Sequence, residues 1–103
     1  MSQSSPQLTQ LQFEVHGRVQ GVFFRAHTVS HAQKLGLVGW CANTARRTVV
    51  GEVQGPEDKV EEMKYWLGHV GSPASSITRL DVAKVGPIEA LGFGEMSRRP
   101  NVP

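Results

Sequence analysis

A short segment with two glycines and an arginine is the strongest candidate for chemistry in this sequence. It runs from Gly17 to Arg25 and reads Gly-Arg-Val-Gln-Gly-Val-Phe-Phe-Arg. Two glycines four positions apart allow the backbone to form a tight loop that approaches a ligand closely. An apolar periodic segment follows and predicts a helix, whose first N–H groups have no partner within the helix. We therefore expect a loop of free N–H groups that binds an anion.

Arg25 stands where this helix would begin. Its guanidinium could fold back over the loop and hold two oxygens of a phosphate or a carboxylate. The alternative is a plain strand-to-helix turn with an exposed arginine, since Gly and Arg are common at such turns. The segment matches neither the Walker loop nor G-x-G-x-x-G, because the glycine spacing differs and no Lys-Ser/Thr pair follows. The residues thus predict a phosphate cradle of another kind.

The elements that would position this loop follow from the spacing of apolar residues. Alternation of apolar and polar residues predicts strands, and apolar residues three or four apart predict helices. The predicted strands cover 11–16, 37–43, 48–54 and 77–85, with a possible fifth around Leu91 and Phe93, and the predicted helices cover 24–35 and Pro56 to about 70. The buried face of the first helix is expected to carry Phe24, Thr28, Ala32 and Leu35, and that of the second Val60, Met63, Leu67 and Val70. Gly36 and Gly71 are expected to end the two helices.

The predicted order of elements is β-α-β-β-α-β. Two helices on one face of an antiparallel sheet of four to five strands make a ferredoxin-like α/β sandwich. A chain of 103 residues is long enough for one such domain. We expect a disordered N-terminal tail over residues 1–10, a single domain over 11–97 and a frayed C-terminal tail over 98–103.

The composition bears on whether the protein binds nucleic acid or a membrane and on where in the cell it acts. The chain has 11 Lys and Arg against 9 Asp and Glu, mostly dispersed, which does not favour nucleic-acid binding. No segment approaches the length of an apolar membrane span, and no secretory signal is visible. Cys41 is the only cysteine, so neither an internal disulfide nor a Cys-rich metal site is possible. These features predict a cytoplasmic protein that uses no membrane. We also expect a monomer, although none of these features determines the oligomeric state.

His27 and His31 suggest an alternative, because they lie four apart on the first predicted helix, as zinc ligands do in some peptidases. Thr28 stands where the catalytic glutamate of those enzymes would be, and no third ligand is evident. Packing or surface histidines are the simpler interpretation. We therefore predict no metal and no cofactor.

Three segments in order resemble the acylphosphatase family. They are Gly17 to Arg25, Leu35 to Thr44 (Leu-Gly-Leu-Val-Gly-Trp-Cys-Ala-Asn-Thr) and Val49 to Gly55 (Val-Val-Gly-Glu-Val-Gln-Gly). The likeness covers about Phe13 to Pro73. It implies hydrolysis of the carboxyl–phosphate bond of small acyl phosphates, with inorganic phosphate as a product.

The resemblance also implies roles for particular residues. Arg25 matches the arginine that holds the phosphate, and Asn43 matches the asparagine that positions the attacking water. Loop N–H groups complete the phosphate site, and Thr44 is a supporting residue; the loop comprises Arg18, Val19, Gln20, Gly21 and Val22. Arg47 departs from the family, which usually has glycine in the turn after the asparagine, and little of the family's last strand is visible after Gly86.

These groups would suffice for the reaction. An acyl phosphate is an activated anhydride whose leaving carboxylate has a pKa around 4, so it needs no strong general acid. What remains is to neutralise the phosphoryl oxygens and to hold a water in line, and phosphoryl transfer depends mainly on such positioning. Neither a metal nor a covalent nucleophile is required.

Three other interpretations remain open from the sequence. Cys41, Arg47 and Thr48 spell C-x5-R-T, which resembles the motif of cysteine-dependent phosphatases. An RNA-recognition module can share the predicted fold, but it displays stacking aromatics on its central strands, and residues 48–54 contain none. A non-enzymatic anion sensor would use the same cradle without turning the anion over.

Overall fold

The computed structural model describes residues 7–103. The expected disordered tail over 1–10 therefore falls largely on residues 1–6, which lie outside the described part of the chain. Residues 8–10 already belong to the first strand. No helix among residues 7–103 is long and apolar enough to cross a membrane.

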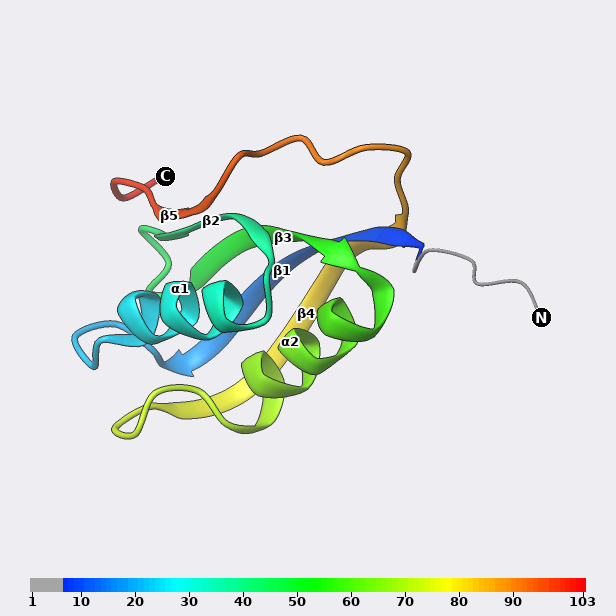
Figure 1. The fold of residues 1–103 in the computed structure, drawn as a ribbon. Coiled ribbons are helices and arrows are strands. Elements are labelled where there is room, and N and C mark those ends of the chain that lie inside the picture. The colour runs from blue at the N-terminus through cyan, green and yellow to red at the C-terminus, as the bar shows by residue number, and fades with distance from the viewer. Residues whose placement is uncertain (1–6) are drawn as a thin grey trace.

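Every predicted helix and the first four predicted strands are present, with ends that shift by a few residues (Figure 1). The elements in chain order are β1 (Leu8–Arg18), α1 (Phe24–Lys34), β2 (Val38–Asn43), β3 (Val49–Pro56), α2 (Glu57–His69), β4 (Ser76–Pro87) and β5 (Met96–Arg98).

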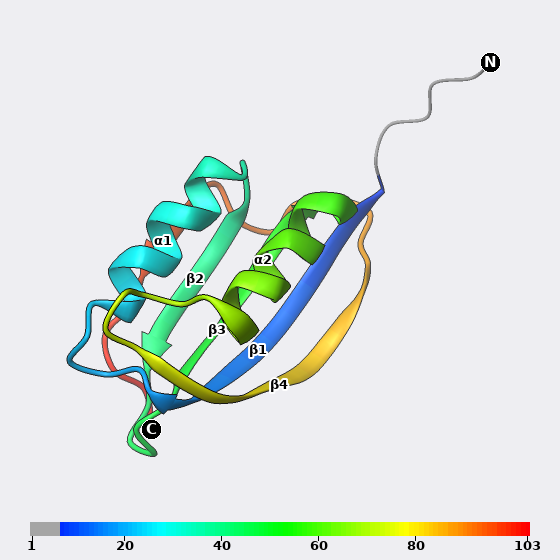
Figure 2. The same cartoon turned by 90° about the horizontal axis from the view of Figure 1, so that it is seen from below.

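The strands form one sheet in the order β4-β1-β3-β2-β5. Both helices lie on the same face of this sheet, as Figures 1 and 2 show from two directions. The central strands pair antiparallel, with Leu11 of β1 opposite Val53 of β3, and Cys41 of β2 opposite Gly51 of β3. The predicted ferredoxin-like sandwich is confirmed.

The fifth strand was predicted in the wrong place and the wrong direction. Leu91 and Phe93 lie in no strand, and β5 instead pairs parallel with β2, so that Met96 lies opposite Gly39. The sheet is therefore mixed rather than all antiparallel. Because β4 and β5 lie at opposite edges, residues 88–95 must cross the sheet, and they do so on the face away from the helices (Figure 1). Three residues are too few for a strand to show alternation in the sequence.

The C-terminal residues differ from the expected frayed end. Arg99 N donates a hydrogen bond to the Cys41 carbonyl over 2.8 Å, and Val102 N donates to the Asn43 carbonyl over 2.8 Å. Val102 in turn accepts a hydrogen bond from Ala45 N over 3.2 Å. The end of the chain therefore runs along β2 and the turn that follows it.

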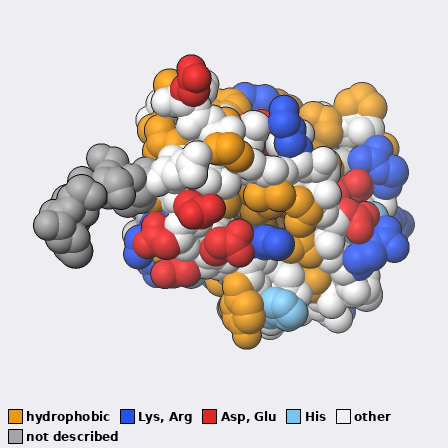
Figure 3. Space-filling view, turned by 90° about the vertical axis from the view of Figure 1, so that its right-hand side faces the viewer, with side chains coloured by type: hydrophobic (Ala, Val, Ile, Leu, Met, Phe, Trp, Pro, Cys, Tyr) orange, Lys and Arg blue, Asp and Glu red, His pale blue; other side chains and the backbone are white. Residues whose placement is uncertain are grey.

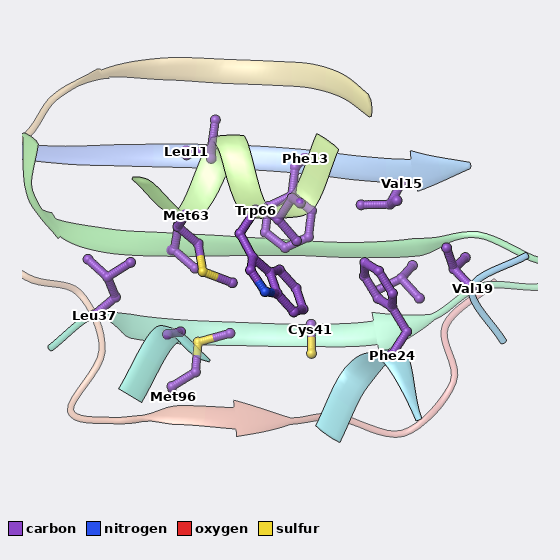
Figure 4. Close-up of a cluster of buried hydrophobic side chains, with 14 of the residues drawn as sticks. Leu11, Phe13, Val15, Val19, Phe24, Leu37, Cys41, Met63, Trp66 and Met96 are labelled. Atoms are coloured by element: carbon purple, nitrogen blue, oxygen red, sulfur yellow. The ribbon is translucent and has the colours of Figure 1, made fainter. Parts of the chain in front are cut away.

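The core lies between the helices and the sheet, where side chains of β1 face those of α2 (Figure 4). On α1, the predicted residues Phe24, Thr28 and Ala32 are buried and Leu35 is half-buried. The buried face of α2 consists of Val60, Met63, Trp66 and Leu67. Val70 was predicted wrongly: it is 53% exposed, because α2 ends at His69 and the chain turns at Gly71 with φ 67°.

Candidate active site

The loop between β1 and α1 has the backbone that its glycines predict. Gly21 has φ 75° and Gly17 has φ 123°, both in the left-handed region that favours glycine. A Cβ on Gly17 would also collide with the carbonyl oxygen of Ser76 on β4. Phe23 follows with φ 59° although it is not glycine, and its side chain is 78% exposed. Such a conformation costs about 1–2 kcal/mol for a non-glycine residue, and this strain lies directly beside the loop.

The N–H groups of this loop point to anion binding. Within residues 7–103, none of the N–H groups of residues 19–22 donates a hydrogen bond to a protein acceptor. Helix α1 begins immediately afterwards at Phe24, and no side chain caps its N-terminus. Free donors and the positive end of the helix dipole therefore occur together, as the sequence predicts.

The side chain of Gln20 attaches the loop to the β2–β3 hairpin. Its Nε2 donates hydrogen bonds to the carbonyl oxygens of Thr44 and Thr48, each over 3.0 Å. Sequence reasoning assigned only the Gln20 backbone to the site and missed this role. No local pattern could have revealed it, because the two carbonyls lie more than twenty positions away and are brought near by the sheet.

A cleft of about 290 Å³ lies where the loop, the start of α1 and the end of β2 meet. The structure brings Arg25 and Asn43 together here, although they are far apart in the sequence, and both are half-buried. The lining residues are Val19, Gln20, Gly21, Phe23, Phe24, Arg25, Ala26, Asn43 and Arg98.

Arg25 occupies the first turn of α1 and reaches the C-terminal segment. Its Nη1 donates a hydrogen bond to the carbonyl oxygen of Arg99 over 3.3 Å. This bond uses one of the five N–H donors of the guanidinium, so the remaining donors are available to an anion in the cleft.

Asn43 is the last residue of β2, and its backbone is held on both sides. It pairs with Val49 of β3, and its carbonyl accepts the hydrogen bond from Val102. Its side-chain Oδ1 is buried and has no hydrogen-bond partner among the described residues. A buried acceptor without a partner is costly, and such groups occur preferentially where a ligand or a water binds.

Three residues that were predicted to bind substrate do not line this cleft. The Thr44 hydroxyl lies 2.6 Å from the Thr48 hydroxyl and accepts a hydrogen bond from Arg46 N over 3.1 Å, so it is engaged in the hairpin turn. Val22 is buried in the core. Arg18 lines a separate cleft of about 300 Å³ beside Arg47.

The turn that carries Thr44 has one residue with a strained backbone and two residues that donate hydrogen bonds to Glu14. Arg47, which replaces the expected glycine, has φ 65°. Thr48 donates its hydroxyl proton to Glu14 Oε2 over 2.6 Å, and Arg46 Nη2 donates to the same oxygen over 3.2 Å. The Thr48 hydroxyl and, less strongly, Arg46 lower the pKa of Glu14 below its ordinary value, despite partial burial. The ionised Glu14 thus stabilises the hairpin beside Asn43.

The alternative with Cys41 as a nucleophile conflicts with the structure. Cys41 is fully buried on β2, and burial raises its pKa to about 12. Its Sγ points to the Arg25 carbonyl at 3.8 Å, and the residues after it continue as a strand and a hairpin rather than a helix. A thiol with this pKa is not ionised at neutral pH, so it cannot serve as the nucleophile.

The two histidines of α1 have different surroundings. His31 stacks on Trp66 with the ring centroids 5.1 Å apart, while His27 is exposed. Burial, and to a lesser degree Lys34, lowers the pKa of His31. Packing therefore explains why a histidine stands at position 31.

One cluster outside the cleft has suitable ligands for a metal. Glu14, His16 and Asp81 offer ligand atoms within 4.8 Å of one another on the open face of the sheet. Arg46 already binds Glu14, and Arg79 Nε lies 3.0 Å from Asp81. These guanidinium groups neutralise the carboxylates and would repel a cation.

Comparisons with known proteins point to one family. The sequence profile described as "Acylphosphatase" matches residues 11–93. Acylphosphatase-2 of Gallus gallus is 50% identical over 99 residues, which cover 96% of this chain and 96% of the relative. Acylphosphatase-2 of Homo sapiens is 50% identical over 92 residues, which cover 89% of this chain and 93% of the relative.

Solved structures show the same similarity. The acylphosphatase from Bacillus subtilis superposes with a TM-score of 0.77 at 32% identity, covering 88% of this chain and 98% of that one. The acylphosphatase from Coxiella burnetii gives a TM-score of 0.79 at 27% identity, covering 90% of this chain and 94% of that one. The profile and the relatives each cover most of the chain. The chain therefore belongs to the acylphosphatase family.

Proposed function

We propose that this protein is an acylphosphatase that hydrolyses the carboxyl–phosphate bond of small acyl phosphates. One observation carries the proposal: Arg25, Asn43 and the loop of residues 19–21 line a single cleft. The membership of the chain in the family supports the same activity.

The phosphoryl group is bound by the loop and by Arg25. Loop N–H groups without protein acceptors donate to its oxygens, and the dipole of α1 adds a favourable field. The Arg25 guanidinium supplies further, charge-assisted donors. Together they stabilise the negative charge on the phosphoryl oxygens in the transition state.

Asn43 positions the nucleophile. Its Oδ1, which is buried without a partner among the described residues, accepts a hydrogen bond from a water molecule and so directs a lone pair of the water oxygen towards phosphorus. The water oxygen forms a bond to phosphorus while the bond from phosphorus to the acyl oxygen breaks. The carboxylate leaves with that electron pair, and the water proton passes to solvent. Thr44 supports the site indirectly through the hairpin turn.

No metal or other cofactor is needed in this mechanism. The leaving carboxylate is a weak base, and Arg25 with the loop N–H groups supplies the charge stabilisation that a metal provides elsewhere. The partners are then the small acyl phosphate and inorganic phosphate. We also propose that the protein acts as a monomer, and its location in the cytoplasm stays a prediction.

The RNA-recognition alternative has less support. Figure 3 shows acidic, basic and hydrophobic side chains interspersed on one side of the molecule, with acidic groups gathered in one part of it. Trp40 is an aromatic on the open face of the sheet, but Arg99 already lies over its ring at 4.6 Å. The ring face that a base would stack on is therefore partly occupied.

An assay of acyl phosphate hydrolysis tests the proposal directly. Benzoyl phosphate is incubated with the purified protein, with and without a metal chelator, and inorganic phosphate is added as a competitor. We expect turnover that the chelator leaves unchanged and that phosphate inhibits competitively. Binding of phosphate without turnover would instead identify an anion sensor, and loss of turnover with chelator would identify a metalloenzyme.

A further inference from the structure

A second arginine faces the candidate active site from the edge strand. Arg98 lies on β5, opposite Cys41 of β2 in the parallel register, and lines the same cleft as Arg25 and Asn43. Its side chain is exposed, and within residues 7–103 it makes no hydrogen bond or ion pair. Parallel pairing with β2 brings into the site a residue that the sequence placed in a frayed tail.

The cleft holds two positive charges and no carboxylate. Its lining includes both Arg25 and Arg98, and none of the other lining residues is acidic. Burial raises the pKa of the Cys41 thiol, while the charges of Arg25 and Arg98 both oppose this rise. Both guanidinium groups therefore contribute to a positive field in this cleft, which attracts anions.

The phosphoryl group does not need Arg98. It presents three terminal oxygens, and these are served by the free N–H groups of residues 19–22 and by the donors of Arg25. The position of Arg98 also differs from theirs. Gln20 attaches the loop to the turn between β2 and β3. Arg98 instead lies on β5, which is the neighbour of β2 on the side away from β3. Arg98 thus reaches the cleft from a different element than the cradle.

We propose that Arg98 binds a second anionic group at the far end of the acyl chain, so that this protein prefers monoacyl phosphates of dicarboxylic acids. The inference rests on the proposed function and adds a substrate class to it. A distal carboxylate would receive two N–H donors from the Arg98 fork while the phosphate remains in the loop.

A neutral acyl group has a different contact. Phe23 lines the cleft with a side chain that is 78% exposed, and it can pack against an aromatic or aliphatic acyl group. Binding of such a group does not involve Arg98. The two contacts can therefore be separated by a pair of substrates that differ only in the distal charge.

The experiment compares benzoyl phosphate with 4-carboxybenzoyl phosphate. Values of kcat/KM are measured for the wild type, for Arg98→Met, which keeps much of the side-chain volume without charge, and for Arg98→Lys. Arg79→Met is the matched control, because it removes an exposed arginine that pairs with Asp81 on β4, away from the cleft. Each measurement is repeated at low and at high salt.

We expect Arg98→Met to lower kcat/KM for the carboxylated substrate by about 10- to 100-fold, as for the loss of a hydrogen bond to a charged group. For benzoyl phosphate, kcat/KM of Arg98→Met should differ from the wild type by less than about twofold. On the carboxylated substrate, kcat/KM of Arg98→Lys should lie between those of the wild type and Arg98→Met. The Arg79→Met control should match the wild type on both substrates. High salt should reduce the ratio of kcat/KM values between the carboxylated and the neutral substrate in the wild type. The same ratio in Arg98→Met should not depend on salt.

An equal loss on both substrates would overturn the inference, because Arg98 would then act on the phosphate. No change on either substrate would overturn it as well. If the wild type hydrolysed neither substrate, the proposed function itself would fail, which is a distinct result.

Discussion

The Arg25 guanidinium is held by the backbone of Arg99: Nη1 donates a hydrogen bond to the Arg99 carbonyl oxygen over 3.3 Å. The Arg99 side chain points to the other face of the sheet, where its guanidinium lies 4.6 Å from the Trp40 ring centroid and 5.9 Å from that of Phe93. The C-terminal segment therefore links an aromatic contact on the open face to Arg25 on the helical face.

Replacement of Arg99 tests this link. Arg99→Met keeps the carbonyl but removes the cation–π contact, so we expect a loss of about 1 kcal/mol in the free energy of unfolding and weaker binding of inorganic phosphate. Urea unfolding and the inhibition constant of phosphate measure the two effects. Amide exchange of Val102 should also accelerate, because its bond to Asn43 depends on the same segment. Faster exchange with unchanged phosphate affinity would show that the segment does not position Arg25.

Arg25 itself is expected to be essential. Arg25→Gln removes the charge and should reduce kcat/KM for an acyl phosphate by about 10²-fold or more, the scale of losing one preorganised donor at a developing charge. Arg25→Lys keeps the charge without the planar fork and should lose less. Near-normal hydrolysis by the glutamine variant, with circular dichroism confirming its fold, would reject the role.

Asn43 offers a cleaner separation of catalysis from binding. In Asn43→Ala we expect kcat to fall by about 10²-fold while the inhibition constant of phosphate stays unchanged, because the proposed role of the amide is to hold the water and not the phosphate. Stability should fall little, since Oδ1 has no partner to lose. A variant with an unchanged rate and intact fold would remove Asn43 from the mechanism.

Arg47 is a place where the protein could be made more stable. Its φ of 65° is unfavourable for any residue with a Cβ, so Arg47→Gly should raise the free energy of unfolding by up to about 1 kcal/mol. Arg47→Ala is the control, because it removes the same side chain and keeps the strain. Equal gains in both variants would mean that charge, and not backbone strain, is responsible.

Glu14 should make stability depend on acidic pH. Its pKa in the folded protein is lowered by the Thr48 hydroxyl and by Arg46, so the unfolded chain binds the proton more readily than the folded one. The stabilisation is therefore fully present above the unfolded pKa of about 4.3 and is lost as the pH falls through the folded pKa. Urea unfolding from pH 6 downwards should show a shallower decline in Glu14→Gln than in the wild type. Parallel curves would contradict the assignment.

Much of the scaffold could be predicted from local patterns. The buried faces of α1 and α2, the turn at Gly71 and the left-handed glycines of the loop all depend on residues a few positions apart. Val70 shows the limit of this reasoning, because it continues the apolar spacing of α2 but falls beyond the end of the helix.

The loop, the helix that follows it and the candidates Arg25 and Asn43 could all be predicted from the sequence. Three features became visible only in the folded chain: Gln20 attaches the loop to the hairpin, β5 pairs parallel with β2, and Arg98 enters the cleft. Backbone conformation and helical faces depend on neighbours along the chain, whereas these three contacts join residues that the sheet brings together from distant parts of the sequence. Strand β5 has only three residues, of which Met96 alone is buried, so the sequence carries no alternation that would predict this strand.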